Sequence, residues 1–386
     1  MAIDFYWRLP THGDHATIRR ASLDRGDWSP LSAGSQAPGL TAAGEEDGFR
    51  YIDHLAEIAR AAEISGFIGG LIPSFPNTDD PWVISPLLAR ETKSFRFMIA
   101  FQPGFLNPVQ AARLSASLQR ATGGRTVFNV ITGGGGPSQL WWGDSFSHDD
   151  RYGRTSEFLD VFKGVWKDPG FTFEGRFYTV RNGGLAPLLG REEIPEIWFS
   201  GSSEAALQSA ARHADYYLSW LEPYDQLQDK FAKVKARTAQ LGGEQKCAIR
   251  VDLVARATEE EAWRDVRIGF ENVTDETRAR WRGQPTDSVG ASRQAALRPT
   301  EAKRWDELVV GRNLWGGFNL LRGGPALGIV GSYEQCAEQL DELIHRGADA
   351  FILAGTPHLE EAYRIGEEVL PLLGRTATAG LLQAAE

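Results

Sequence analysis

The chain has 386 residues and a net charge of −10, which argues against a surface that binds nucleic acid or an anionic membrane. Its hydrophobic content of 42% is sufficient for a large buried core. No apolar run reaches the length of about 18 residues that spans a membrane, and the N-terminus lacks the pattern of a secretion signal. The two cysteines are far apart and fit no zinc-ligand spacing. We therefore expect a cytoplasmic protein without a structural metal.

Short apolar segments alternate with helical patterns along the whole chain. The predicted strands are 3–9, 67–72, 95–101, 126–131, 196–200, 215–220, 246–256 and 348–354. The predicted helices are 51–62, 87–92, 108–121, 155–166, 204–213, 224–240 and 359–373. Three further segments read as insertions: a long loop at 16–47, an excursion with a hairpin at 167–193, and a mostly helical stretch at 257–345.

Eight strands alternating with helices are typical of a (β/α)8 TIM barrel, the α/β fold that we predict for residues 1–386 as one domain. A doubly wound sheet is the alternative. It is disfavoured because no G-x-G-x-x-G motif follows the first predicted strand. In a TIM barrel the active site lies at the carboxyl ends of the strands. The residues that follow each strand are therefore the candidates for function.

The fifth predicted strand ends in Ser200, Gly201, Ser202 and Ser203, and an Ala-rich helical pattern follows. The first N–H groups of a helix have no partner within it and lie at the positive end of its dipole. With the serine hydroxyls beside them, they can bind an anion such as a phosphate. An ordinary helix start capped by serine explains the same residues equally well.

The other strand ends carry no catalytic triad and no convincing cluster of metal ligands. They offer amides, hydroxyls, aromatic rings and charges instead, namely His12, Asn77, Thr78, Asn129, Thr132, Trp220, Arg250, Asp252, Thr356 and His358. Arg250 stands between two apolar residues of a predicted strand, so we expect it to point into the barrel. This set of groups suits a flat, phosphorylated cofactor in the mouth of the barrel.

Six motifs resemble those of the bacterial alkanesulfonate monooxygenases, which are luciferase-like flavin monooxygenases. They are FYWRLPTHGD at 5–14, FNVITG at 128–133, GSS at 201–203, NLW at 313–315, LRGG at 321–324 and PHLEEAYR at 357–364. The similarity extends from about residue 3 to residue 374. The Trp-rich loop and the motif at 77–82 are most similar to the sulfoquinovose monooxygenase branch.

The resemblance implies that a separate flavin reductase supplies reduced FMN, which the barrel uses with O2 to cleave the C–S bond of a sulfonate. The products would be sulfite and a carbonyl compound. The implied FMN-binding residues are Asn129, Thr132, Tyr152, Ser200, Gly201, Ser202 and Ser203. The implied catalytic residues are Arg250, Arg322, His12 and Asp252, and the implied substrate-binding residues are Trp220, Thr78, Asn77, Thr356 and His358. A homodimer or a tetramer is implied as well.

A sulfonate is a permanent anion with three acceptor oxygens, and the planar fork of an arginine matches such a group better than a lysine does. We expect Arg250 and Arg322 to clamp the sulfonate while Asp252 orients Arg250 or binds a hydroxyl. His12 would hydrogen-bond or transfer a proton. The segment 275–312 is expected to form a lid, although a solvated helical insertion remains the alternative.

The family often has Cys, His and Tyr where this chain has Thr78, Asp252 and Thr356. Smaller and hydrogen-bonding groups favour a bulkier, hydroxylated substrate, so sulfoquinovose is the leading hypothesis, with 6-oxo-glucose as the carbonyl product. Three other functions stay open. The substrates could be simple alkyl sulfonates, a deazaflavin could replace FMN for hydride transfer, or the protein could bind flavin or sulfonate without turnover.

Overall fold

A computed structural model of the chain describes residues 3–20, 51–76, 78–187, 189–280, 287–297, 299 and 301–374. The predicted loop at 16–47, apart from its first five residues, lies outside these ranges. The candidate site residue Asn77 also lies outside them.

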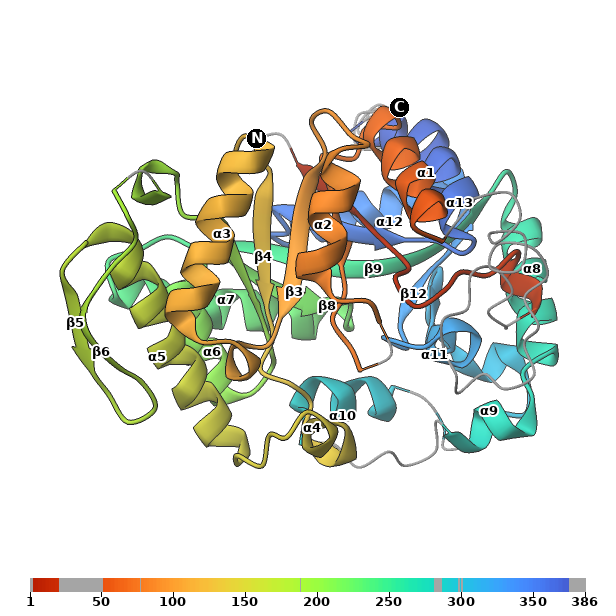
Figure 1. The fold of residues 1–386 in the computed structure, drawn as a ribbon. Coiled ribbons are helices and arrows are strands. Elements are labelled where there is room, and N and C mark those ends of the chain that lie inside the picture. Colours follow the sequence, from red (N-terminus) through yellow and green to blue (C-terminus); the bar gives the residue numbers. More distant parts are fainter. Residues whose placement is uncertain are drawn as a thin grey trace, which may run out of the picture.

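Eight parallel strands form a closed barrel, which confirms the predicted TIM-barrel fold (Figure 1). They are β1 (Asp4–Arg8), β2 (Gly69–Ile72), β3 (Arg96–Phe101), β4 (Thr126–Val130), β7 (Glu196–Ser200), β8 (Tyr216–Trp220), β9 (Lys246–Arg256) and β13 (Ala350–Ala354). Neighbouring strands pair in that order, and β13 closes the ring by pairing with both β9 and β1. Each strand falls within a predicted strand segment.

The inside of the barrel is packed by alternate residues of the strands, because successive side chains of a strand point to opposite faces. Tyr6 and Ala248 belong to this interior cluster and are fully buried. Arg8, Arg250 and Asp252 lie two or four residues further along the same strands and therefore on the same inward face. The barrel thus has an apolar floor and a charged layer near its mouth.

The helices cover the outside of the barrel and bury a larger apolar cluster against it. They are α1 (Tyr51–Ile64), α2 (Pro81–Ala89), α3 (Pro108–Thr122), α5 (His148–Lys167), α6 (Glu204–His213), α7 (Tyr224–Gln240), α12 (Tyr333–His345) and α13 (His358–Arg364). Within the described ranges, no helix has the length and apolar character needed to cross a membrane.

Two helices begin earlier than predicted, and in both the cause is an unrecognised cap. The helix predicted at 87–92 starts at Pro81, because Asp80 accepts a hydrogen bond from the Trp82 N–H at 2.8 Å and proline suits the first helical position. The helix predicted at 155–166 starts at His148, after the cap Ser147. Proline and aspartate are also common in turns, so the local sequence does not separate a cap from a loop here.

The predicted insertions differ in how well the sequence described them. The hairpin is confirmed as β5 (Phe171–Glu174) paired antiparallel with β6 (Thr179–Gly183). The stretch 257–345 holds the helices α8 (Glu259–Glu271), α9 (Asp275–Arg280), α10 (Val289–Ala296) and α11 (Phe318–Arg322). It also holds three short strands that the prediction missed: β10 (Val309–Gly311), β11 (Leu314–Trp315) and β12 (Gly328–Ser332), which extend the sheet beyond β9.

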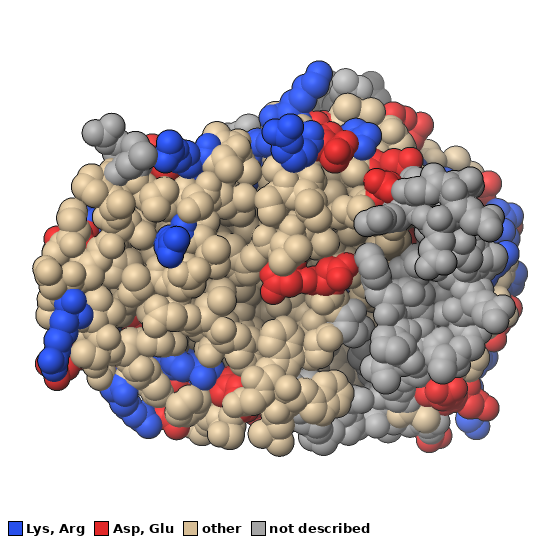
Figure 2. Space-filling model, in the orientation of Figure 1, with Lys and Arg blue, Asp and Glu red and all other residues tan. Residues whose placement is uncertain are grey.

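The charges on one face of the molecule are distributed unevenly (Figure 2). Over α2 and α3 the surface is mostly uncharged, with acidic side chains in a short central row. Basic side chains on this face are scattered toward its edges rather than gathered into one patch.

The cap of α2 provides a test of the fold. Replacing Asp80 by Ala removes the acceptor for the Trp82 N–H, and we expect the free energy of unfolding to fall by about 1 kcal/mol. Asp80→Asn keeps an acceptor oxygen and should lose much less. Urea unfolding followed by circular dichroism measures both, and equal losses in the two variants would contradict the capping role.

Candidate active site

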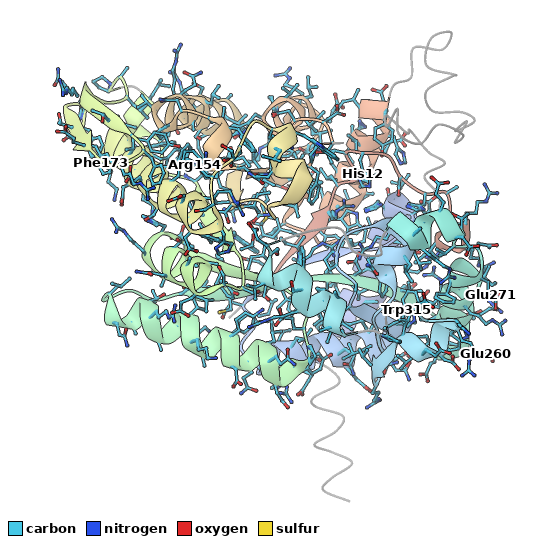
Figure 3. The ribbon with its side chains drawn as sticks, turned by 90° about the horizontal axis from the view of Figure 1, so that it is seen from below. His12, Arg154, Phe173, Glu260, Glu271 and Trp315 are labelled. Carbon is cyan, nitrogen blue, oxygen red and sulfur yellow. The ribbon has the colours of Figure 1, made fainter. Side chains whose placement is uncertain are left out.

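The candidate site lies at the carboxyl ends of the strands, toward the bottom of Figure 1, where α4 (Gly136–Trp141) and α10 also lie. Figure 3 views the molecule from that side. His12 and Arg154 appear in it on different sides of the barrel, with Arg154 toward the β5–β6 hairpin. Within the described ranges, no group of three His, Cys, Asp or Glu side chains could hold a metal ion.

The turn between β7 and α6 is held in one backbone conformation. Ser203 caps α6 by accepting a hydrogen bond from the Ala206 N–H at 3.2 Å. The serine cap considered from the sequence is therefore present. Gly201 has a φ of 143°, and a Cβ at this position would lie 2.7 Å from the Tyr152 hydroxyl. Tyr217 donates a hydrogen bond to the Gly201 carbonyl at 2.7 Å. The structure therefore brings Tyr152 to the serine turn, and only glycine fits there.

A buried lysine that the sequence analysis missed lies behind this turn. Lys230, from α7, donates hydrogen bonds to the hydroxyls of Ser202 and Ser219, each at 3.1 Å. It also forms an ion pair with the buried carboxylate of Glu222 at 2.6 Å. Burial lowers the pKa of Lys230, and Glu222 opposes that change. The signal was present in the helical period, because Lys230 falls on the same face of α7 as the buried Leu227 and Phe231.

On the opposite side of this turn, β4 and the loop after it contribute amide and hydroxyl groups. Asn129 and Thr132 are buried. The side-chain oxygen of Asn129 is buried without a hydrogen-bond partner among the described residues. A buried polar atom without a partner requires an explanation, and a bound ligand is one.

The short helix α10 and the residue before it lie against several loops of the mouth. Asp287 forms an ion pair with Arg151 at 2.7 Å, and its N–H donates to the Gly134 carbonyl at 3.2 Å. Further along, Gln294 donates to the Leu221 carbonyl at 2.7 Å. Together these contacts anchor α10 beside the ends of both β4 and β8.

Arg293 connects α10 to the lysine behind the serine turn. Its guanidinium lies 3.3 Å from Glu222, the same carboxylate that binds Lys230. A Cβ on Gly290 would lie 3.6 Å from the Ser202 hydroxyl and 3.9 Å from the Trp220 ring. The helix therefore covers the strand ends that carry these two residues, which is the placement a lid would need.

Across the mouth, two arginines share one carboxylate. The two terminal guanidinium nitrogens of Arg250, Nη1 and Nη2, donate to Asp252 at 2.8 and 3.1 Å. Arg322, from α11, forms an ion pair with the same carboxylate and donates to the Pro325 carbonyl at 3.3 Å. Burial lowers the pKa of Arg322 to about 9, so it remains charged at neutral pH. Its Nε is buried and unpartnered among the described residues.

A third arginine of this layer was not recognised from the sequence. Arg8, at the end of β1, is half-buried, and its Nη1 lies 3.3 Å from Nε2 of His358. Burial, reinforced by the nearby charge of Arg250, lowers the pKa of Arg8 to about 10. The inward alternation from Tyr6 could have found this residue, since it places Arg8 on the barrel's inner face.

Behind Arg8 lies a buried set of histidines around Asp14. His358 donates from its Nδ1 and its backbone N–H to Asp14, at 2.7 and 3.0 Å. Burial alone would raise the pKa of Asp14, but His358 and His54 hold it well below its usual value. Burial lowers the pKa of His12 well below its usual value, and Arg8 adds to this effect, so His12 is neutral at neutral pH.

The remaining predicted residues lie at the rim or at the end of β13. Thr78 forms hydrogen bonds within its own turn, to the carbonyls of Pro73 and Phe75. It lines a cavity of about 500 Å3 that also touches Trp141 and Trp142. Trp142 is stacked on another aromatic ring. Trp141 is therefore the more accessible of the two tryptophans. Thr356 is buried after β13.

Trp220 joins the two sides of the mouth. It pairs in register with Arg250 on the neighbouring strand, and 37% of its surface is exposed. Trp220 therefore lies between two groups of predicted residues at the carboxyl ends of the strands. The serine turn with Tyr152, Asn129 and Thr132 forms one side, and Arg250, Asp252 and Arg322 form the other.

A family model described as luciferase-like monooxygenase matches residues 31–350, and the chain belongs to this family. Similar solved structures include a long-chain alkane monooxygenase, with a TM-score of 0.72, 16% identity and coverage of 98% of this chain and 92% of that one. The EDTA monooxygenase of Chelativorans sp. BNC1 has a TM-score of 0.69 and 18% identity, with 98% and 95% covered.

A third similar structure is the oxygenating constituent of a diketocamphane monooxygenase of Pseudomonas putida in complex with FMN. Its TM-score is 0.67 at 18% identity, with 97% of this chain and 99% of that chain covered. Together these neighbours show the fold of the luciferase-like flavin monooxygenases.

The serine turn offers a direct test of its geometry. Gly201→Ala introduces a Cβ in an unfavourable backbone conformation and against the Tyr152 hydroxyl. We expect it to destabilise the protein by about 1 kcal/mol or more beyond the backbone cost alone. Gly143→Ala is the matched control, because Gly143 has a φ of 75° and no atom near its added Cβ. Thermal unfolding compares them, and equal losses would contradict the close approach of Tyr152.

Proposed function

We propose that this protein is a monooxygenase that uses reduced FMN and O2 to cleave the C–S bond of an organosulfonate. The leading substrate is sulfoquinovose, with sulfite and 6-oxo-glucose as products. One observation carries the proposal: the arginines around Asp252 share a barrel mouth with a glycine-serine turn backed by a buried lysine. That arrangement suits a phosphorylated cofactor and an anionic substrate together.

The residues of the serine turn fit the phosphate of FMN. Ser202 and Ser203 supply hydroxyls at the start of α6, Gly201 lets Tyr152 approach the turn closely, and Lys230 adds a positive charge. Asn129 has a buried acceptor to offer the flavin ring system. The same role is proposed for Ser200, Thr132 and Tyr152. Reduced FMN, when bound, supplies the electrons that activate O2.

The charged side of the mouth would bind and orient the substrate. Arg250 and Arg322 are fixed by Asp252, so little rotamer entropy is lost when they bind a sulfonate. Trp220 and Thr78 would contact the rest of the substrate at the rim, and Thr356 and His358 lie below. Neutral His12 can accept or pass a proton. Docked α10 would exclude water from the covered site.

We further propose that a separate flavin reductase delivers the reduced FMN, and that the protein assembles as a homodimer or tetramer. Both expectations come from the family resemblance. The family membership supports a two-component flavin monooxygenase.

The test of the function is sulfite release across a panel of sulfonates with FMN, NADH, O2 and a purified flavin reductase. We expect sulfite from sulfoquinovose in amounts that depend on the reductase. Sulfite from octanesulfonate alone would select an alkanesulfonate monooxygenase. Flavin binding without any sulfite would select a non-catalytic binding protein, and oxygen-independent hydride transfer with a deazaflavin would select the deazaflavin-dependent alternative.

Arg250→Met tests the clamp. It removes a buried charge partner of Asp252, and truncating one member of such a pair costs about 2–5 kcal/mol. We expect kcat/KM for sulfite release to fall by about thirtyfold or more while FMN affinity stays unchanged. Arg113→Met, an exposed site on α3, is the control. Unchanged turnover of the Arg250 variant would refute the clamp.

Lys230→Met tests the phosphate side. Because a charge-assisted hydrogen bond contributes about 1.5–3 kcal/mol, we expect FMN affinity to fall by roughly ten- to a hundredfold. Affinity for riboflavin, which lacks the phosphate, should stay the same. Lys233→Met on an exposed position of the same helix is the control. Fluorescence titration measures both flavins, and an equal loss for both would show that Lys230 is only structural.

A further inference from the structure

We propose that Arg8 determines substrate specificity, because its uncompensated positive charge selects a substrate with one negatively charged group. Arg250 and Arg322 supply shape and hydrogen bonds beside it. The inference rests on the proposed function and deepens it, since it names the residue that supplies the unmatched charge.

The three arginines differ in their partners. Arg250 and Arg322 both form ion pairs with Asp252. Arg8 forms no ion pair with a carboxylate among the described residues, and the single hydrogen-bond partner of its side chain there is Nε2 of His358. A guanidinium with five donors and one neutral acceptor has capacity left for an anion.

The protonation of His358 decides whether it neutralises the charge of Arg8. Its Nδ1 lies 2.7 Å from a carboxylate oxygen of Asp14, which can only accept. Burial lowers the pKa of His358, the charges of Arg8 and Arg250 lower it further, and Asp14 opposes them; the net shift is downward, so the ring is neutral at neutral pH. The Nδ1 therefore carries the proton, and Nε2 presents a lone pair to Arg8. His358 holds the guanidinium in place without neutralising it, as a carboxylate would.

The strand register fixes the position of Arg8 in the barrel. Trp7 pairs with Leu353 on β13, and Ala354 pairs with Asp252 on β9. Arg8 is therefore level with Asp252, and the small Ala354 stands between them on the intervening strand. Arg8 thus belongs to the same inner layer as the arginine–aspartate cluster.

Two neighbouring groups also lack partners. The Nδ1 of His12 and the Nε of Arg322 are buried and without hydrogen-bond partners among the described residues. His12 is close enough to Arg8 for the arginine to lower the pKa of the ring. Open donors and acceptors around an uncompensated cation indicate a polar ligand at this place.

The charges of the cluster then suggest the kind of ligand. Arg8, Arg250 and Arg322 carry three positive charges, and Asp14 and Asp252 carry two negative ones. One positive charge remains, so one sulfonate leaves the cluster neutral, whereas a second anionic group would be left uncompensated in a largely buried site.

The experiment uses the full chain and isothermal titration of sulfoquinovose and octanesulfonate, alongside the sulfite assay. We expect Arg8→Met to weaken binding of the sulfonate that wild type binds by about tenfold or more and to raise KM more than it lowers kcat. Arg8→Lys keeps the charge but loses the fork, so its affinity should lie between. FMN affinity should be unchanged in both variants, which reports that the fold is intact.

Ethane-1,2-disulfonate tests the charge match. Wild type should bind it more weakly than ethanesulfonate, and Arg8→Met should lose affinity for both. If wild type releases sulfite but Arg8→Met binds sulfonate as well as wild type does, the role of Arg8 is wrong and the proposed function stands. If wild type neither binds nor cleaves any sulfonate, the proposed function itself is wrong, and the role of Arg8 fails with it.

Discussion

The site depends on one buried carboxylate that two guanidinium groups share. Asp252 is nearly inaccessible to water and binds both Arg250 and Arg322. Burying these charges is expensive unless each finds a partner, so the ion pairs hold the arginines in a defined geometry without a ligand. A substrate then meets a preorganised surface. Because β9 carries both Arg250 and Asp252, a single strand sets the spacing of this cluster.

A second shared carboxylate links the serine-turn side of the site to the covering helix. Glu222 binds Lys230, behind the serine turn, and Arg293, on α10. Helix α10, which lies over the mouth, is therefore connected through Glu222 to Lys230, the residue that would contact the cofactor phosphate. Both halves of the site follow the same physical pattern, in which one acidic side chain near a strand end fixes two basic ones from different elements.

Local sequence was sufficient for the eight barrel strands and for the helix cap at the serine turn. The apolar run of β9 predicts a strand, and the alternation of side chains along that strand places Arg250 on one face. The start of α2 was missed because Asp80 and Pro81 are residue types that are also typical of turns, although proline is favoured just after a cap such as Asp80. The short strands β10 to β12 were missed because so few residues carry no usable period.

Arg8 and Lys230 show more clearly what the local sequence cannot reveal. Both lie in segments whose type was predicted, yet neither was recognised as part of the site. Their significance depends on partners far away in the chain, His358 for Arg8 and Ser202 for Lys230. The sequence by itself determined the alternation of strands and helices, since that depends on local periodicity. Only the tertiary structure decided which charges are paired and which is left over, because pairing depends on distances between segments that the closed barrel brings together.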